Sequence, residues 1–340
     1  MKVRLAEIAE RAGVSIATVS RVLNDKPGVH ERTRRAVLTA VDVLGYDRPS
    51  RLRPHLSGLV GLIVPELENP IFPRFAQVLE TALARSGHTP LLCTQSPGGI
   101  HEDDYVETLL ARGVSGIVFV SGMHANTQTD PARYQRLLGL GMPVVLVNGF
   151  MGEVAAPFVS ADEAQASDLA VAHLANMGHT RIGLATGQQR YMPVIRRVEG
   201  FHAAMRAHVD ADLSDADLNE LVETTYYTIE GGSLAARALL DRGVTALVCG
   251  SDLMALGAIQ GARQRGLAVP RDVSVVGSDD SLLVAFTDPP LTTVRQPVAA
   301  MAEATCRALL EQIAGRHAAA TEQMFAPELV VRGSTARVPG

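Results

Sequence analysis

Residues 5–24 read LAEIAERAGVSIATVSRVLN, and the spacing of their apolar side chains predicts two short helices joined by a turn. The first helix covers residues 5–12 and ends at Gly13, because glycine adopts a left-handed backbone at little cost. The second covers residues 16–24 and is preceded by Ser15, whose hydroxyl can accept a hydrogen bond from an early backbone N–H. This stretch therefore decides how the beginning of the chain folds.

A third amphipathic helix is predicted at about residues 31–44. Two short helices separated by a glycine-containing turn and followed by a third make a helix-turn-helix unit. The second helix carries Thr18, Ser20 and Arg21 on its outward face, and a helix of this kind fits the major groove of DNA. A plain three-helix bundle is the alternative, and this polar face argues against it.

Charge is distributed unevenly along the 340 residues. Residues 1–58 contain eleven Lys and Arg against six Asp and Glu, a net charge of +5, whereas the whole chain carries −5. The rest of the chain therefore carries −10. A small basic head on an acidic body is typical of a protein that binds a polyanion.

The pattern changes after residues 47–58, a linker rich in Arg, Pro and Ser. Short aliphatic strands then alternate with amphipathic helices, which favours parallel sheets covered on both faces. This predicts an α/β core of two doubly wound lobes, with a ligand site beyond the carboxyl ends of the strands. The predicted strands are Val60–Val64, Pro90–Cys93, Gly116–Val120, Val144–Val147, Phe158–Ser160, Ile182–Ala185, Ala246–Cys249 and Val273–Val276. The predicted helices are 74–86, 103–112, 131–140, 163–177, 196–208, 231–242, 252–265 and 297–314.

Motifs for catalysis and metal binding are missing from the sequence. It contains no Gly-x-Gly-x-x-Gly, Walker A, Gly-x-Ser-x-Gly or His-Glu-x-x-His motif, so we predict no catalytic residues. The cysteines are too far apart for a zinc site or a disulfide framework: Cys93, Cys249 and Cys306. Residues 101–104, His-Glu-Asp-Asp, stand at a predicted helix N-terminus, where acids favour the helix dipole without a metal. We therefore predict neither a metal nor a cofactor.

Two further features bear on the site and on location. Asp279 and Asp280 are neighbours on a loop. Sequence neighbours on a loop rarely both face a ligand, so we predict one ligand contact and one structural carboxylate.

The first residues lack the apolar core of a signal peptide, and no apolar run reaches the ~18 residues of a membrane span. We expect a cytoplasmic protein without a membrane partner.

Residues along nearly the whole chain resemble the lactose repressor (LacI) family. The beginning of the chain resembles the family's headpiece, from Leu5-Ala6-Glu7-Ile8-Ala9 through Ala12-Gly13-Val14-Ser15 to Thr18-Val19-Ser20-Arg21-Val22-Leu23-Asn24. Later matches follow in the family's order: Asn69-Pro70-Ile71-Phe72, Gly178-His179-Thr180-Arg181-Ile182-Gly183, Ser251-Asp252-Leu253-Met254-Ala255, Val273-Ser274-Val275-Val276-Gly277 and Pro290-Leu291-Thr292-Thr293-Val294.

The resemblance implies three parts: a headpiece at 1–46, a hinge or linker at 47–58, and a core at 59–340 like that of periplasmic sugar-binding proteins. It implies one lobe at about 59–181 and 293–322, and another at about 182–290 and 324–336. It also implies a homodimer, in some members a dimer of dimers, on a pseudo-palindromic operator. Located at the nucleoid when bound to DNA, such a protein represses transcription under the control of a small-molecule effector, here expected to be a sugar or related metabolite acting as inducer.

The resemblance also carries site residues over to this chain. Ile16 and Ala17 stand where the family varies its base contacts, Arg21 is a further base reader, and Leu56 is the candidate minor-groove wedge. The remaining expected DNA-contacting or neighbouring packing positions are Ser15, Thr18, Ser20, Asn24 and Thr33. The expected effector contacts are Phe72, Asn148, Arg197, Ser251, Asp279 and Gln296.

Several residues depart from the family pattern. Arg4 replaces the usual first cap, and His30 stands where Ser often caps the third helix. The hinge is short and contains Pro54, which a helix tolerates only in its first turn. The sequence therefore leaves open whether the hinge forms a helix.

The sequence also leaves open which molecule the effector is and whether it weakens or strengthens DNA binding. Arg197 and Asp279 suit the hydroxyls of a neutral sugar, but Arg197 suits a carboxylate or phosphate equally well. A corepressor-dependent repressor is an alternative. A sugar-binding module or an enzyme that kept only the architecture is another, and the fused headpiece argues against it.

Overall fold

The computed structural model describes residues 5–23, 26, 28–44, 58–95, 99–316 and 318–338. The chain divides into two units, Met1–Leu56 and Ser57–Gly340. Within the described residues, no helix is both long enough and apolar enough to cross a membrane.

The first unit consists of three helices at the predicted positions: α1 (Leu5–Ala12), α2 (Ile16–Leu23) and α3 (Glu31–Val43). Gly13 ends α1 with φ +64°, a backbone conformation that is strained for residues with a side chain. Its N–H donates to the carbonyl of Glu10 at 3.2 Å. The inward faces of the helices form one small apolar core: Ile8, Ala9, Val19, Val22, Leu23, Val37, Ala40 and Val41.

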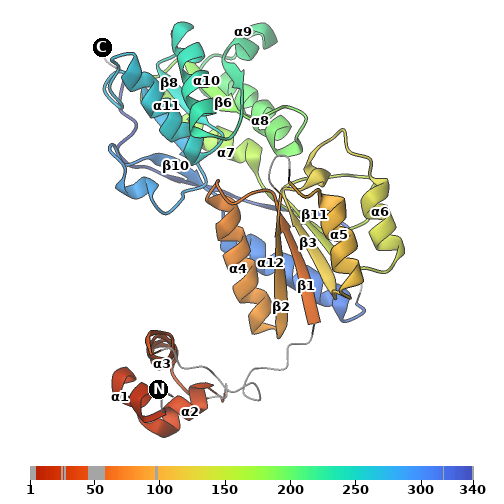
Figure 1. Ribbon diagram of the computed structural model, residues 1–340. Coiled ribbons are helices and arrows are strands. Elements are labelled where there is room, and N and C mark those ends of the chain that lie inside the picture. The colour runs from red at the N-terminus through yellow and green to blue at the C-terminus, as the bar shows by residue number, and fades with distance from the viewer. Residues whose placement is uncertain are drawn as a thin grey trace. The chain divides into compact units, whose positions relative to one another are not determined.

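The second unit begins with a six-stranded sheet in the order β11-β5-β4-β3-β1-β2, in which every neighbouring pair is parallel. Its strands are β1 (Gly58–Val64), β2 (His88–Thr94), β3 (Gly116–Val120), β4 (Val144–Val147), β5 (Phe158–Ala161) and β11 (Glu322–Phe325). Figure 1 shows its helices on the two faces of the sheet: α4 (Ile71–Arg85) and α12 (Val298–Ile313) on one, α5 (Glu102–Ala111) and α6 (Ala132–Gly139) on the other.

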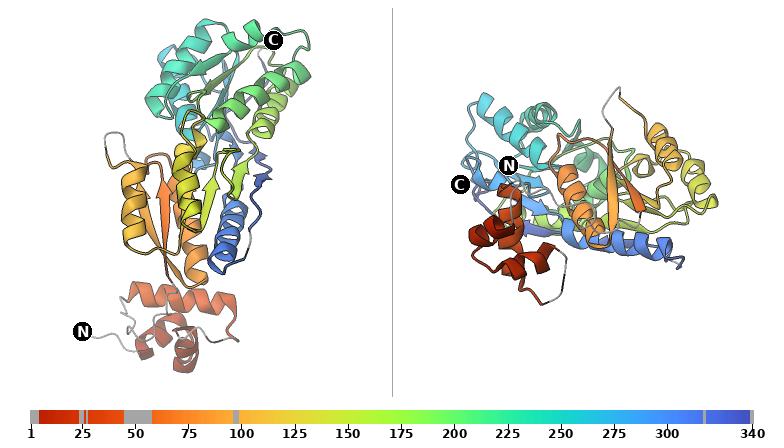
Figure 2. Two further views of the ribbon diagram at one scale, coloured as in Figure 1. Left: turned by 90° about the vertical axis from the view of Figure 1, so that its right-hand side faces the viewer. Right: turned by 60° about the horizontal axis from the view of Figure 1, so that its bottom comes forward.

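A second six-stranded sheet has the order β12-β10-β9-β8-β6-β7. Its strands are β6 (Ile182–Thr186), β7 (Val222–Thr224), β8 (Ala246–Cys249), β9 (Ser274–Ser278), β10 (Thr292–Arg295) and β12 (Glu328–Val330), and only β12 runs antiparallel to its neighbour. Helices again cover it, as the two views in Figure 2 show: α7 (Glu163–Asn176), α8 (Met192–His208), α9 (Asp215–Glu220), α10 (Ile229–Asp241) and α11 (Asp252–Gln264). The core therefore has the predicted architecture of two doubly wound α/β lobes.

The chain crosses between the lobes three times, and each crossing differs from the sequence expectation. The last one follows β11 at Phe325 instead of residue 322, because the whole of β11 pairs with β5 in the first sheet. Helix α7 belongs to the second lobe rather than the first, because Ala170, Val171 and Leu174 pack in the second lobe's core. Strand β10 also belongs to the second lobe, because it pairs with β9. The second lobe thus starts near residue 163 instead of 182, and the return to the first lobe follows β10 instead of residue 293.

All eight strands predicted from aliphatic runs are present, with ends shifted by at most two residues. The predictions omitted β7, β10, β11 and β12, which are three or four residues long. Unlike β4 and β8, which are equally short but wholly apolar, these strands contain polar residues: a glutamate in β7, β11 and β12, and Thr-Thr-Val-Arg in β10.

Candidate functional site

The start of α2 is held by the side chain of Ser15. Its Oγ accepts the backbone N–H of Thr18 at 3.1 Å and lies 2.9 Å from the Thr18 hydroxyl. This is the predicted N-cap, and it satisfies one of the N–H groups that a helix leaves without an intrahelical partner. At α3, the Nδ1 of His30 accepts the backbone N–H of Arg32 at 3.4 Å, so the histidine takes over part of the capping.

The other face of α2 is open to solvent. Ile16 is 51% exposed, Ala17 and Arg21 are exposed, and Val19 is buried in the headpiece core. Half-buried positions border this face: Thr18, Ser20 and, on α3, Thr33. An exposed helix face with one arginine at its end has the size and chemistry to enter the major groove. The expected contacts Asn24 and Leu56 lie outside the described residues, as does Pro54 of the hinge.

A cavity of about 320 Å³ lies between the two lobes, at the carboxyl ends of strands from both sheets. Of the six expected effector contacts, five line it: Phe72, Asn148, Arg197, Asp279 and Gln296. Ser251 does not line it, because its buried Oγ caps α11 by accepting the N–H of Met254 at 3.2 Å. The neighbouring Gly250 lines the cavity in its place.

Three residues that follow strands in this cavity have a left-handed backbone although they are not glycine. Ser121 follows β3 with φ +47°, Asn148 follows β4 with φ +57°, and Asp279 follows β9 with φ +108°. Such conformations cost free energy and persist where the surrounding structure holds them, often at ligand sites. They turn these side chains to the cavity instead of letting the strands continue.

A buried ion pair forms one wall of the cavity. Arg197 is 6% exposed and donates through Nε and Nη2 to Oε2 of Glu163, at 3.0 and 2.5 Å. Its Nη1 donates to the carbonyl of Gly250 at 2.7 Å and to the hydroxyl of Tyr227 at 3.2 Å. Burial opposes the charge on Arg197, but the Glu163 carboxylate outweighs it, so the pKa of the arginine lies above its usual value.

Gly250 is needed for this arrangement. A Cβ at this position would lie 2.6 Å from Nη1 of Arg197 and 3.0 Å from the ring of Tyr227. The missing side chain therefore lets the guanidinium approach the backbone carbonyl.

Asp279 also lines the cavity, and its Oδ1 accepts a hydrogen bond from Nε2 of Gln296 at 2.8 Å. Burial raises its pKa well above the usual value, the nearby carboxylate of Asp252 raises it further, and Arg197 opposes both. The Oε1 of Gln296 is buried and has no hydrogen-bond partner among the described residues. An amide oxygen left without a partner at a cavity wall is suited to a ligand hydroxyl.

Asp280, next in the chain, has a different environment. Its carboxylate accepts Nε of Arg295 at 2.7 Å and Nη2 of Arg332 at 2.5 Å, and it does not line the cavity between the lobes. These two pairs connect the loop after β9 to β10 and to the end of the chain. One of the two aspartates thus faces the cavity and the other holds the loop.

Glu163, Tyr191 and Tyr227 line the cavity but were not expected there. From the sequence, Glu163 was predicted only to lie in the first turn of a helix. Its position two residues after β5 was the available signal, because residues that follow parallel strands gather at one sheet edge. No group of three or more His, Cys, Asp or Glu side chains in the described part of the chain is arranged to hold a metal ion.

A helix-turn-helix unit followed by a two-lobed core with a cavity at its strand ends defines a DNA-binding regulator controlled by a small molecule. Residues 4–49 match the family model of bacterial regulatory proteins, lacI family, and residues 171–335 match that of a periplasmic binding protein-like domain. The HTH-type transcriptional regulator reg1 of Streptomyces lividans is 60% identical over 340 residues, covering 100% of this chain and 99% of the relative. The chain belongs to the LacI family of bacterial transcription regulators, and it is a regulator rather than an enzyme.

Two solved structures are similar to the whole chain. The transcriptional regulator CelR in its cellobiose complex is 31% identical with a TM-score of 0.72, covering 98% of this chain and 100% of that one. The lac repressor dimer bound to operator and the anti-inducer ONPF is 25% identical with a TM-score of 0.66, covering 99% of this chain and 100% of that one.

Proposed function

We propose that this chain is a repressor that binds a pseudo-palindromic operator as a homodimer and is released when a neutral sugar fills the cavity between its lobes. The dimer of the lac repressor on its operator and the cellobiose bound to CelR support the two halves of this proposal. A protein with this role acts in the cytoplasm, at the nucleoid while it is bound to DNA.

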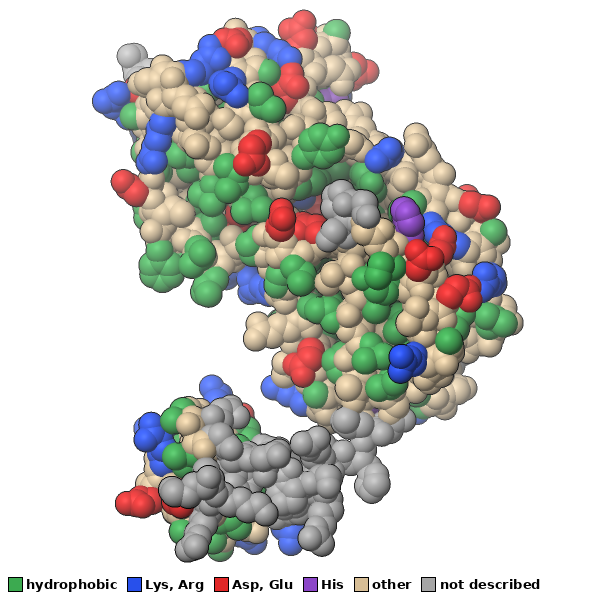
Figure 3. All heavy atoms as spheres, in the orientation of Figure 1, with side chains coloured by type: hydrophobic (Ala, Val, Ile, Leu, Met, Phe, Trp, Pro, Cys, Tyr) green, Lys and Arg blue, Asp and Glu red, His purple; other side chains and the backbone are tan. Residues whose placement is uncertain are grey.

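The observation that supports a neutral ligand is the balance of charges in the lining of the cavity. Arg197 is its only lining cation among the described residues, and Glu163 already neutralises it. The other charged lining residues, Glu66 and Asp279, are acidic. On the face drawn in Figure 3, acidic side chains lie beside the hollow between the lobes. A phosphate or carboxylate would find no unpaired positive charge here, whereas a neutral sugar needs only hydrogen bonds.

The contacts that we propose for the sugar use groups left available by the protein. Gln296 offers its unpartnered Oε1, and Asp279 offers Oδ2 beside the Oδ1 that Gln296 occupies. Asn148 accepts the N–H of Ala161 through Oδ1 at 3.2 Å, so its amide nitrogen can donate. Phe72 supplies an apolar face for the ring.

On the DNA side, we assign base reading to the exposed positions of α2, Ile16, Ala17 and Arg21. An arginine can donate two hydrogen bonds to a guanine edge. The neighbouring positions would contact phosphates or position the helix: Ser15, Thr18, Ser20, Asn24 and Thr33. Leu56 remains our candidate for the minor-groove wedge.

The homodimer has a candidate surface on the second lobe. Leu282, Leu283 and Phe286, around the short 3₁₀ helix η3 (Val284–Phe286), are 82%, 72% and 82% exposed. Figure 3 shows hydrophobic side chains projecting from the edge of this lobe. An apolar cluster this exposed favours association with another protein surface, here a second copy of the chain.

The test is a pair of titrations on the full-length protein. A thermal-shift screen of neutral sugars, sugar phosphates and nucleobases first identifies a ligand, since a ligand at 100 times its Kd adds roughly 2.7 kcal/mol of stability. Operator affinity is then measured by fluorescence anisotropy with and without that ligand. We expect a neutral sugar to stabilise the protein and to weaken operator binding, and operator to weaken sugar binding by the same factor.

Other outcomes separate the alternatives. A ligand that tightens operator binding would make the protein a corepressor-dependent repressor. Stabilisation by sugar phosphates alone would show that the charge argument is wrong. Turnover of the sugar by the pure protein would revive the enzyme alternative.

A further inference from the structure

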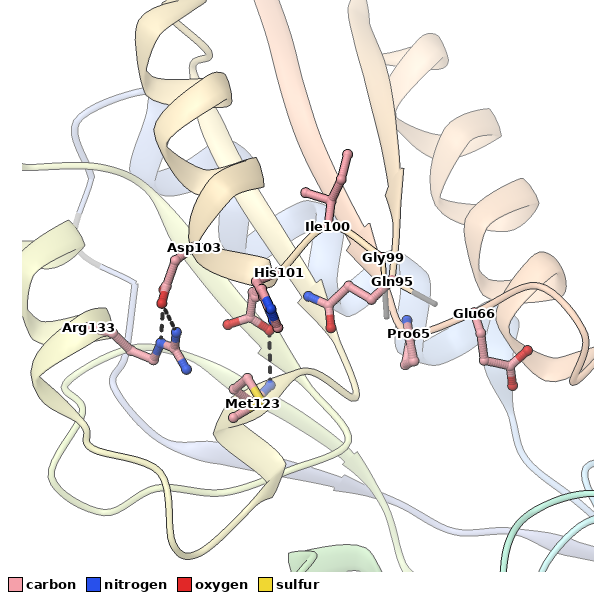
Figure 4. A pocket seen from close by; sticks show the side chains of 10 residues that line it. Pro65, Glu66, Gln95, Gly99, Ile100, His101, Asp103, Met123 and Arg133 are labelled. Atoms are coloured by element: carbon pink, nitrogen blue, oxygen red, sulfur yellow. Dashed lines mark hydrogen bonds and ion pairs between the residues drawn. The ribbon is translucent and has the colours of Figure 1, made fainter. Parts of the chain in front are cut away.

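A second cavity, of about 450 Å³, adjoins the one between the lobes. Pro65 and Glu66 line both, so the two cavities adjoin at the loop that follows β1. The short 3₁₀ helix η2 (Met123–Ala125) separates them elsewhere, because Met123 lines the second cavity and Ala125 lines the first. Figure 4 shows the second cavity with its lining side chains.

The two cavities follow successive strand ends of the first sheet. The cavity between the lobes, called the effector cavity below, is lined by residues that follow β4, β3 and β1 of the first sheet. The second cavity is lined by residues that follow β1 and β2, where Gln95 comes directly after the edge strand β2. Neighbouring strands are about 4.8 Å apart, so the path from β3 to β2 covers about 10 Å. A ligand that lies along this path is elongated and parallel to the row of strand ends.

Charged groups in the second cavity are already paired within the protein. Nε of Arg133 donates to Asp103 at 3.2 Å. Glu102 accepts the N–H of Met123 at 2.9 Å through Oε2 and the hydroxyl of Tyr134 at 2.6 Å through Oε1. Among the described residues of its lining, the second cavity therefore offers no unpaired lysine or arginine to an anionic group, which disfavours phosphorylated ligands.

One polar side chain of the second cavity is left without a partner. The Nε2 of Gln95 is buried and has no hydrogen-bond partner among the described residues. Figure 4 shows its amide reaching toward His101, across the cavity from Arg133 and beside Pro65. A buried amide donor in a cavity is unfavourable unless a ligand hydroxyl or water meets it. Pro65, Met123 and Ile100 add apolar surface, so the wall combines hydrogen-bonding and apolar parts in the way that sugar rings require.

We propose that the second cavity is a subsite for the second and further units of a neutral oligosaccharide whose terminal unit occupies the effector cavity. This inference rests on the proposed function, and it narrows the effector from sugars in general to oligosaccharides. Gln95, which lines the second cavity but not the first, is the residue that distinguishes such a ligand from a monosaccharide.

The experiment measures Kd by calorimetry for glucose, maltose, cellobiose, maltotriose and cellotriose with the full-length protein. We expect affinity to rise with chain length in one of the two linkage series by about tenfold or more. Gln95→Leu should remove about fivefold of that gain, the range of one lost hydrogen bond, and leave the shortest binding saccharide within about twofold. Gln95→Glu keeps the size of the side chain and should act in the same direction, and Gln264→Leu, an exposed position on α11, is the control.

The outcomes separate this inference from the proposed function. Equal affinity at every chain length, or the same gain with length in both Gln95 variants as in the wild type, would overturn the second subsite and leave the sugar site intact. If none of the five saccharides binds, both the subsite and the proposed sugar effector fail. Binding of the shortest saccharide by each variant shows that it is folded.

Discussion

The headpiece and the core use arginine in opposite ways. Arg21 on α2 is exposed and has no ion-pair partner among the described residues, whereas Arg197 in the core is 6% exposed and bonded to Glu163, Gly250 and Tyr227. A side chain that reads DNA must be available to bases that arrive from outside. A side chain in a ligand cavity must be oriented before the ligand arrives, because ordering it on binding would cost affinity.

The headpiece and the core are also stabilised by different interactions. The headpiece has one small apolar core and capped helices, and the core unit has two large sheets with buried charges between them. Changes to the exposed face of α2 should therefore affect binding more than folding. Changes at the cavity should affect both, since an unpaired buried charge is destabilising.

The largest effect is expected from removing the headpiece. Deletion of residues 1–57 should lower operator affinity by about 10³-fold or more, because it removes the helix that reads the bases and leaves an acidic core that DNA phosphates repel, while saccharide affinity stays within about twofold. Anisotropy with operator and calorimetry with saccharide measure the two quantities. Tight operator binding by the truncated core would contradict the division of roles between the two units.

Arg197→Met should lower the free energy of unfolding of the core by about 3–5 kcal/mol, because it leaves the Glu163 carboxylate buried without its partner. Urea unfolding measures the change. The double variant Arg197→Met/Glu163→Gln should recover part of the loss, and both should lose saccharide response while the folded protein still binds operator. A double variant as unstable as the single one would show that the charge pair is not the cause.

His124 should make the core sensitive to acid. It is buried, its Nε2 contacts the carbonyl of Val147 at 3.1 Å, and burial lowers its pKa from 6.5 to about 4. The unfolded chain therefore binds more protons than the folded one between these values, so stability is lost as pH falls from 6.5 toward 4, by about 3 kcal/mol.

The variant His124→Gln, which keeps a donor for Val147, isolates this contribution. The difference in unfolding free energy between wild type and variant, measured at pH 7 and pH 5, removes opposing contributions such as that of Asp252, whose pKa burial raises to about 6. The wild type should lose more stability than the variant on acidification. If the unfolding free energies of wild type and variant changed equally with pH, groups other than His124 would cause the acid sensitivity.

In the headpiece, Arg21→Ala should cost about 1–3 kcal/mol of operator binding and relax the preference at one base pair. Arg35→Ala is the matched control, since Arg35 is exposed on α3, where its Nε lies 3.6 Å from Glu31. Affinities for operator and random DNA give the readout. Equal weakening on both DNAs would make Arg21 a phosphate contact.

The smallest effect is expected from Ser15→Ala, which should destabilise α2 by about 1 kcal/mol through loss of its cap. Faster amide exchange in α2 is the measurement. Ser214→Ala, which removes the corresponding cap of α9 in the core, should leave exchange in α2 unchanged. Unaltered exchange after Ser15→Ala would show that other contacts hold the start of the helix.

The sequence by itself determined the headpiece and the layout of the core. Helix spacing, Gly13 and the Ser15 cap act within a few residues, so local pattern was sufficient to predict α1, α2 and α3. Aliphatic runs of three to five residues located eight strands for the same reason. Phe72, Asn148 and Asp279 could be expected at the cavity because each closely follows a strand or a recognisable family motif.

Only the tertiary structure decided which distant residues meet. Glu163 lies 34 residues from Arg197 in sequence, yet shares a hydrogen bond of 2.5 Å with it. Strand β10 joined the second lobe through its pairing with β9, and that pairing also brings Thr293 to Asp252 at 2.6 Å. The physical reason is that such contacts depend on the order of strands and on where the chain crosses between lobes. The periodicity of side chains within one segment contains no information about strand order or about the crossings. The second cavity lies at two neighbouring strand ends, so it too depends on the strand order.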